Sequence, residues 1–531
     1  MKSSSESTGI SSLASQSVVY GFGGVLARML GFVLVPIYLH AAGPSAFGTV
    51  ELMLAAVLFA SILLRMGIVV SMSRFTIGET EQREWAPIVH TIFTFVMIAA
   101  TGGVVVGFLL RGLIGDALEV SDDIVYAGLF GLWISMNYDV MARVYRIERR
   151  ARAWVQFTLL NVVLTAVLTV VLVVWFDTGA LGLLIGNFTG TAIVYAILIV
   201  ARRETVGVRR FETPVLRELL VFSLPLMPAN IALWALNLAD RLQVQQLASH
   251  PALGSYSAAA RVSMAMAMIM GAFQTAWAPY AHQVRGTEGD AKAKITYARV
   301  LTYWSVVMGW GLVGISLLAP PYIRATFPSS TFDAIPVVPL LAIGIVLYGC
   351  YLIVNIGVTV SRKTRMTPII CTFAAALNIG LNFWFIPEHG IVGAGITTVI
   401  GYAVLLWLGW WNAQRSYPVH YNWPRIGRVA VVVTVFLAAS EWLIPESGIV
   451  WLVVRGAIAL AFPLALLASG ATRSASRQRW TPWTSSCDPP TAAVVLPDVL
   501  REVRCGPGRG RRLLPDVRRR VSGARRDTGG A

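Results

Sequence analysis

Long apolar runs separated by short polar segments recur along the chain from Ser17 to Ser469. Each run has about 20 residues, the length that an α-helix needs to cross the hydrocarbon core of a bilayer. The pattern predicts an all-α polytopic membrane protein with fourteen transmembrane helices. The expected spans are residues 17–40, 47–70, 87–111, 124–144, 154–176, 179–201, 217–238, 253–281, 297–319, 334–360, 367–387, 391–413, 426–444 and 449–469.

Basic residues are distributed unevenly between the expected spans. The connections after even-numbered spans hold 22 Lys and Arg residues, whereas those after odd-numbered spans hold only Arg111, Arg241 and Arg324. Because cytoplasmic loops carry an excess of Lys and Arg, the even-numbered connections are predicted to be cytoplasmic. Both termini are then expected in the cytoplasm.

The junction between spans 5 and 6 recurs between spans 11 and 12. An acid followed by three glycines reappears 211 residues later, as Asp177, Gly179, Gly182 and Gly190 against Glu388, Gly390, Gly393 and Gly401. Phe47 and Tyr256 give a similar offset of 209 at the junctions of spans 1–2 and 7–8. Six spans per unit therefore repeat, and because six is even the two units enter the membrane in the same sense.

Two parallel six-helix lobes that face one cavity are typical of a transporter that alternates access by rocking. The expected organisation is a polar N-terminal segment at 1–16, lobes at 17–210 and 211–415, an extra transmembrane hairpin at 416–470 and a basic tail at 471–531.

Composition excludes an ordinary soluble enzyme, because 56% of the residues are hydrophobic and only 13% are charged. Half of the net charge of +16 lies at one end, since residues 471–531 hold 13 Arg and 5 acids. This segment has few aromatic residues among its arginines, only Trp480 and Trp483. It is therefore predicted to be a disordered cytoplasmic tail that touches anionic lipid, rather than a nucleic-acid-binding module.

Motifs for catalysis or ATP binding are absent from the sequence. There is no GxxxxGK[ST], HExxH or GxSxG stretch, and the six histidines share no metal-ligand spacing. The four cysteines form no framework for disulfides or metal. We expect no enzyme activity, cofactor or metal, so that transport work comes from a gradient, the membrane potential or consumption of the product.

Charged residues inside the spans are the candidate functional groups, since each costs a few kcal/mol in the membrane and tends to face a cavity. Arg28, Arg65, Arg261 and Arg455 lie within spans, and all are cations, which favours an anionic substrate. Arg28 and Arg261 are the deepest and are predicted to face the cavity.

Other charges near the membrane leave two interpretations open. Arg65, Asp139 and Arg455 could equally extend to an interface, and Asp139 could form a helix ion pair with Arg143. Asp240 is predicted at the outer end of span 7, where it could cap a loop. Prolines in spans 1, 7 and 8 indicate either broken helices that line a site or packing kinks; these are Pro36, Pro225, Pro228 and Pro279.

Several segments together resemble bacterial polysaccharide flippases of the multidrug/oligosaccharidyl-lipid/polysaccharide exporter superfamily. They are YGFGGVLARMLGFVLVPIYLHAAGPSAFGTVEL, FSLPLMPANIALWALNLADRLQV with GSYSAAARVSMAM, and FIPEHGIVGAGITT, and the likeness runs from about Ser17 to about Arg415. The resemblance implies a carrier in the bacterial cytoplasmic membrane. Such a carrier moves undecaprenyl-diphosphate-linked oligosaccharide to the outer leaflet for cell-surface polysaccharide biosynthesis.

The resemblance also implies roles for particular residues. Arg28 and Arg261, with Arg65 as a third candidate, would supply the family's cationic lumen. The resemblance is most specific in three short motifs that follow one another, LPLxP, ADR and GxY. Asp240 and Arg241 match the DR of the second motif, which implies a role in coupling transport to an ion or in the structure. Asp139 could share that role. Expected partners are the polyprenyl-diphosphate-linked glycan, membrane lipid and polysaccharide-assembly proteins. The extra hairpin is similar to that of fourteen-span lipid II flippases, where it forms a groove for the lipid tail.

Two rival functions remain at this point. A multidrug or organic-cation antiporter of the same superfamily would need a buried carboxylate in the lobe cores. A membrane-embedded glycosyl polymerase or ligase would need a large outer loop, and no odd-numbered connection is long enough for one.

Overall fold

Helices account for the architecture of the protein wherever the computed structural model describes it. The described residues are 3–68, 85–148, 150–202, 211–361, 363–443 and 449–468, and no strand occurs among them. Helical segments coincide with all fourteen expected spans. The prediction of an all-α polytopic membrane protein is confirmed. The basic tail at 471–531 lies outside the described residues.

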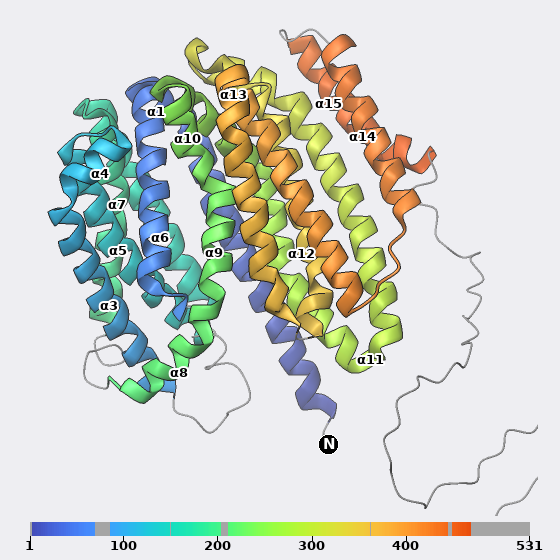
Figure 1. Ribbon diagram of the computed structural model, residues 1–531, viewed down its shortest axis with the longest axis horizontal. Coiled ribbons are helices and arrows are strands. Elements are labelled where there is room, and N and C mark those ends of the chain that lie inside the picture. Colours follow the sequence, from blue (N-terminus) through green and yellow to red (C-terminus); the bar gives the residue numbers. More distant parts are fainter. Residues whose placement is uncertain are drawn as a thin grey trace, which may run out of the picture. The chain divides into compact units, whose positions relative to one another are not determined.

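We call the helices of the first six spans the first repeat; α3 to α7 and the second part of α1 lie together (Figure 1). Spans 1 and 2 are joined in α1, which bends at Gly43, where φ is 80°. A π-helical turn at Val171–Trp175 continues α6. The helices are α1 (Ser3–Arg65), α3 (Trp85–Leu109), α4 (Arg111–Leu118), α5 (Asp122–Ile147), α6 (Ala151–Val170) and α7 (Gly179–Arg202).

The next six spans form the second repeat, and two further helices follow it (Figure 1). Two of its helices are far longer than one membrane crossing, because 50 residues of α-helix measure about 75 Å. Each of these reverses at a glycine with positive φ, Gly289 in α11 and Gly390 in α13. The helices are α8 (Thr213–Ser223), α9 (Met227–Trp234), α10 (Asp240–Leu247), α11 (His250–Thr326), α12 (Val337–Val360), α13 (Thr367–Ser416), α14 (Trp423–Leu443) and α15 (Ile449–Ala468).

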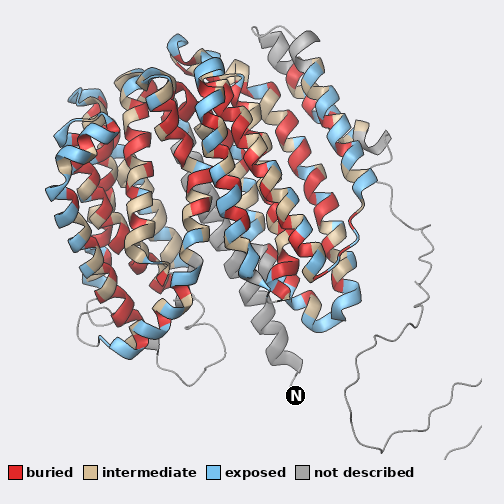
Figure 2. Cartoon of the chain, in the orientation of Figure 1, coloured by how far each residue is buried: buried red, intermediate tan, exposed pale blue. Residues whose placement is uncertain are grey.

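Length and hydropathy identify many of these helices as membrane spans. Within the described part of the chain, eight helices are long and apolar enough to cross a membrane, or nine if the bent pair in span 7 is one span. Large apolar side chains such as Leu109 and Val200 are about 70% exposed, on faces that the bilayer would cover. Figure 2 shows buried residues on the faces where helices meet. The protein is therefore a multi-pass membrane protein.

The internal repeat has a structural counterpart at its glycines. Gly179 and Gly390, which correspond at the offset of 211, have φ values of 55° and 56°. Residues with a side chain rarely adopt this left-handed conformation, so both positions favour glycine. A glycine with positive φ therefore opens both α7 and the second half of α13.

Span 7 is broken and is longer than predicted. The helix pair Thr213–Ser223 and Met227–Leu247 bends by 55° beside Pro225 and Pro228, as a broken helix would. The predicted end at residue 238 is wrong, because the helical path runs on to Leu247. Residues 240–247 are polar and end the apolar run, but five of them are buried among protein side chains instead of facing lipid.

The last two helices pack against α11. The Nε1 group of Trp310 donates to the carbonyl oxygen of Ala459 at 2.8 Å, and Arg455 donates to the carbonyl oxygen of Leu317 at 3.0 Å. Only 3% of Arg455 is exposed, so it lies in the protein interior and does not extend to an interface.

Candidate functional site

A carboxylate of the first repeat is bonded to a guanidinium of the second repeat. The Nε group of Arg261, on α11, donates to Oε1 of Glu51, on α1, at 2.9 Å, and a second nitrogen of the same guanidinium contacts this oxygen. The Glu51 side chain is 6% exposed and that of Arg261 is 29% exposed. The pair therefore joins the two repeats, and its arginine is the accessible partner.

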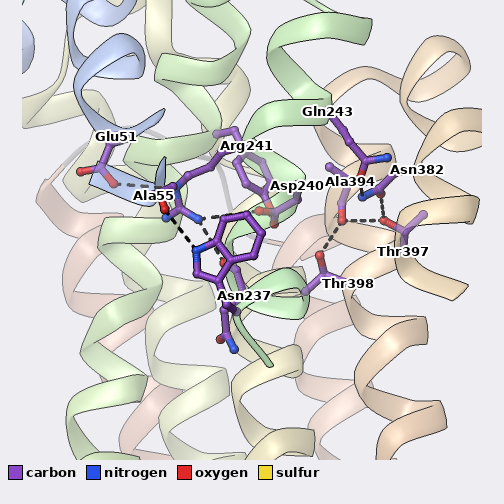
Figure 3. Close-up of polar contacts among 12 residues, drawn as sticks. Glu51, Ala55, Asn237, Asp240, Arg241, Gln243, Asn382, Ala394, Thr397 and Thr398 are labelled. Carbon is purple, nitrogen blue, oxygen red and sulfur yellow. Dashed lines mark hydrogen bonds and ion pairs between the residues drawn. The ribbon is translucent and has the colours of Figure 1, made fainter. Parts of the chain in front are cut away.

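Arg241 and Asp240 extend this pair into a buried cluster. Nε of Arg241 lies 3.8 Å from Oε2 of Glu51, and the guanidinium also lies 3.7 Å from Oδ1 of Asp240 (Figure 3). The hydroxyl of Tyr256 donates to the other carboxylate oxygen of Asp240. Asp240 does not cap a loop, because α10 continues to Leu247 and both charged side chains are only 4% exposed. We call Glu51, Asp240, Arg241 and Arg261 the inter-repeat charge cluster.

The expectation that the deep charges are all cations is wrong. Glu51 is a buried acid within the predicted span 47–70, and it is missing from the predicted set of acids. The sequence signal was present, because Glu51 is the one acid in the apolar run AFGTVELMLAAVLFA, where any charge is costly. With two acids and two arginines, the cluster is neutral when all four groups are ionised.

Arg65 belongs to a separate ion-pair group inside the first repeat. Its guanidinium donates to Oδ2 of Asp139 at 2.8 Å and to the carbonyl oxygen of Ser135 at 3.1 Å. Arg143 also donates to Oδ2 of Asp139, at 3.3 Å, so the predicted helix pair is confirmed. Arg65 follows Glu51 by 14 positions in the same helix, a rise of about 20 Å. The structure therefore does not bring Arg65 into the inter-repeat charge cluster.

Arg28 lies in the first part of α1, but its side chain is outside the described residues. Of the three arginines predicted to bind substrate, the structure thus places Arg261 at the contact between the repeats and Arg65 within one repeat. The role of Arg28 stays a prediction.

Buried amide and hydroxyl groups fix α10 to α13 beside the cluster (Figure 3). The amide nitrogen of Asn382 donates to Oε1 of Gln243 at 2.8 Å, and the hydroxyl of Thr397 donates to Oδ1 of Asn382. Just before α10, Oδ1 of the exposed residue Asn237, in the π-helical turn Ala235–Ala239, accepts a hydrogen bond from the hydroxyl of Tyr402 at 2.7 Å. These bonds hold Asp240 and Arg241 in the frame of the second repeat. No sequence motif marked the network, since single Asn, Gln and Thr residues in apolar spans have many roles.

The two repeats also approach closely beside the cluster. A Cβ atom on Gly48 of α1 would lie 2.9 Å from the backbone nitrogen of Gly254 of α11. The Nε1 group of Trp234, on α9, donates to the carbonyl oxygen of Ala55 on α1 at 3.2 Å. Its ring lies 4.5 Å from that of Phe59, centre to centre. Backbone contact, ring packing and ion pairs therefore join α1 to the second repeat in one region.

The described residues offer no ready metal site. Among them, no group of three or more His, Cys, Asp and Glu side chains gathers closely enough to hold an ion. The inter-repeat charge cluster offers guanidinium and carboxylate groups, which form ion pairs.

A family comparison identifies the chain. Residues 42–336, more than half of the sequence, match the family described as polysaccharide biosynthesis protein. The chain belongs to this polysaccharide biosynthesis family. The match covers all four members of the inter-repeat charge cluster. No curated protein sequence matches this family member.

Solved structures of flippases and transporters share the fold of this polysaccharide biosynthesis family member. An inward closed conformation of the lipid II flippase MurJ matches with a TM-score of 0.67 and 12% identity, covering 85% of this chain and 98% of that one. An inward-facing multidrug resistance MATE family transporter of the MOP superfamily matches with a TM-score of 0.62 and 17% identity, covering 76% and 96%. A MOP superfamily transporter from Pyrococcus furiosus, whose title reports reverse polarity of the binding pocket, has a TM-score of 0.56 and 16% identity, covering 79% and 96%.

The family match and the shared fold together confirm the resemblance to polysaccharide flippases of the multidrug/oligosaccharidyl-lipid/polysaccharide exporter superfamily. This family member is a membrane protein of the flippase and transporter type.

Proposed function

We propose that the protein moves undecaprenyl-diphosphate-linked oligosaccharide from the cytoplasmic to the outer leaflet of the bacterial cytoplasmic membrane, for cell-surface polysaccharide biosynthesis. Two lobes, 17–210 and 211–415, rock about the contact between the repeats to alternate access. The hairpin at 416–470 moves with the second lobe, against which it packs. Both termini lie in the cytoplasm, as the distribution of basic residues predicts.

The observation that carries this proposal is the partly exposed guanidinium of Arg261 between the two repeats. Guanidinium groups form paired hydrogen bonds with phosphate oxygens, which suits a diphosphate headgroup. The headgroup and its sugars must avoid hydrocarbon, while the prenyl chain stays in lipid. Arg28, from the first lobe, is proposed as the second cation that contacts the diphosphate.

The test compares Arg261→Ala with Arg261→Lys in a strain that lacks its own polysaccharide flippase. We expect the alanine variant to abolish complementation and the lysine variant to restore part of it, because lysine keeps the charge but loses the paired geometry. Immunoblotting of membranes checks that both variants are present in equal amounts. Arg28→Ala should behave like Arg261→Ala. Normal complementation by both alanine variants would contradict the site.

A second candidate function is an organic-cation antiporter, and Glu51 is the observation that favours it. A buried carboxylate is the group that such an antiporter needs, and Glu51 is 6% exposed at the contact between repeats. This function predicts that the protein lowers the accumulation of a cationic dye in cells, and that Glu51→Gln abolishes the effect. The flippase proposal predicts unchanged dye accumulation.

A further inference from the structure

Glu51 and Arg261 form a bond that cannot persist when the two repeats separate at this end. The carboxylate belongs to α1 and the guanidinium to α11, and two nitrogens of Arg261 contact one oxygen of Glu51. Among the side chains that the structure describes, Arg241 is the other arginine beside Glu51, and it also belongs to the second repeat. Separation therefore takes Glu51 away from both of these arginines.

Accessibility distinguishes the members of the inter-repeat charge cluster. The Arg261 side chain is 29% exposed, whereas Glu51, Asp240 and Arg241 are 4–6% exposed. An anion that approaches the contact between the repeats therefore meets Arg261 first. The charges of Asp240 and Arg241 neutralise each other within the second repeat. The positive charge that is available to an arriving anion is therefore that of Arg261.

The electrostatic cost of separation depends on what Arg261 contacts. In the empty protein, separation leaves both the Glu51 carboxylate and the Arg261 guanidinium without the partner that each has in the closed state, which is unfavourable. If a phosphate oxygen has replaced Glu51 on Arg261, the guanidinium keeps a partner after separation. Glu51 then faces the opening, where water can solvate it.

We propose that Glu51 is an exchangeable counter-ion for Arg261: a diphosphate group displaces Glu51 from Arg261, and this exchange releases α1 from α11 so that the repeats separate. The inference rests on the proposed function and adds a positioning residue to it. Glu51 makes separation depend on an anionic substrate, and it rejects uncharged lipids that cannot replace it.

Backbone packing supports this role for Glu51. Gly48, three residues before Glu51, packs against Gly254, and a side chain at either position would hold the helices apart. Trp234 bonds to Ala55, four residues after Glu51. The ion pair of Glu51 and Arg261 thus lies within a close contact between α1 and the second repeat. The pair therefore forms when the repeats close at this contact and breaks when they open.

The test measures the distance between the repeats by electron paramagnetic resonance of two spin labels in nanodiscs. Labels are attached to cysteines at Leu113, which is 67% exposed in α4, and at His389, whose side chain is 51% exposed in α13. Both positions lie in odd-numbered connections and hence at the same membrane face. The native cysteines are first replaced by serine; they are Cys350, Cys371, Cys487 and Cys505. The probe is undecaprenyl diphosphate, with undecaprenol as the uncharged control.

We expect the diphosphate, but not undecaprenol, to shift the otherwise unchanged chain toward longer distances. Glu51→Gln should show the longer distances without ligand and bind the diphosphate roughly tenfold more tightly, since the competing carboxylate is gone. Glu51→Asp keeps the charge and should stay closed. Diphosphate binding by the opened Glu51→Gln variant, together with the closed state of Glu51→Asp, would show that misfolding is not the cause of opening.

Two results would overturn the inference: short distances in ligand-free Glu51→Gln, or unchanged diphosphate affinity in that variant. Failure of the proposed function has a different signature. In that case Glu51→Gln opens as expected, but the otherwise unchanged chain does not respond to undecaprenyl diphosphate and proteoliposomes do not translocate lipid-linked oligosaccharide.

Discussion

Gly254 of α11 packs so closely against Pro44 of α1 that a Cβ atom on Gly254 would lie 2.0 Å from the carbonyl oxygen of Pro44. Opposite this contact, a Cβ atom on Gly48 would lie 2.9 Å from the backbone nitrogen of Gly254. Backbone atoms cannot yield as a flexible side chain can, so the two helices meet here only because both positions are glycine. This contact brings Glu51 within reach of Arg261.

Gly254→Ala should therefore prevent close approach of the repeats. The added methyl group meets backbone atoms, and such overpacking costs about 1–3 kcal/mol. We expect a lower melting temperature of the purified protein and weaker complementation of a flippase-deficient strain. Gly102→Ala is the matched control, because nothing lies within 4 Å of a Cβ atom at Gly102. Equal behaviour of the two variants would show that the repeats do not need this contact.

Trp234 contributes both a hydrogen bond and a ring contact across the repeats. Trp234→Phe keeps an aromatic ring near Phe59 but loses the bond to Ala55, which is worth about 1 kcal/mol. Trp234→Leu loses both, and the larger loss should favour separation of the repeats. Spin labels at Leu113 and His389 should therefore show a graded increase in the open population, least for phenylalanine and most for leucine. A phenylalanine variant as open as the leucine variant would assign the effect to the hydrogen bond alone.

The helices could be predicted from sequence because apolar run length dictates membrane crossing, and the repeated glycines because an offset of 211 recurs. The end of span 7 could not be predicted from sequence, because DRLQVQQL is as polar as a loop. This segment is helical in the structure because it is buried beside α13. Glu51 could have been found by the rule that singled out Arg261. The bond between Glu51 and Arg261 could not be predicted, since the two residues are 210 positions apart in the sequence. The similarity of Phe47 and Tyr256 identified the two span junctions that meet in the structure. The backbone contact between these junctions, however, is made by Gly48 and Gly254.

Asn382 connects Gln243 to Thr397 in the buried network of the second repeat. Asn382→Ala would leave Oε1 of Gln243 without its donor, and an unsatisfied buried group costs about 1–3 kcal/mol, whereas the hydroxyl of Thr397 keeps its bond to the carbonyl oxygen of Ala394. We expect a clear drop in melting temperature with the inter-repeat distance unchanged in the folded fraction. Thr359→Val is the control, because its hydroxyl bonds only to a nearby backbone carbonyl on an exposed face. A stable alanine variant would show that the network contributes little.

Arg65 is predicted to stabilise the first repeat rather than to contact substrate. Arg65→Gln leaves Asp139 with Arg143 as its remaining arginine, so we expect reduced protein in the membrane but normal complementation per molecule. Asp139→Asn should reduce the protein level further, because it leaves two arginines, Arg65 and Arg143, without their shared carboxylate. If Arg65→Gln is abundant but inactive, Arg65 contacts substrate after all.

The membrane potential should influence transport if negative charge crosses with the substrate. An inside-negative potential favours the outward movement of each negative charge by about 2.3 kcal/mol per 100 mV. We expect proteoliposomes to translocate lipid-linked oligosaccharide faster when a potassium gradient and valinomycin impose this polarity, and more slowly when the polarity is reversed. Valinomycin without a gradient is the control. Glu51→Gln should remain sensitive to the potential, because the charge that crosses belongs to the substrate and not to the counter-ion. Rates that are equal at both polarities would mean that the charge of the substrate is compensated during transport, for example by an accompanying cation.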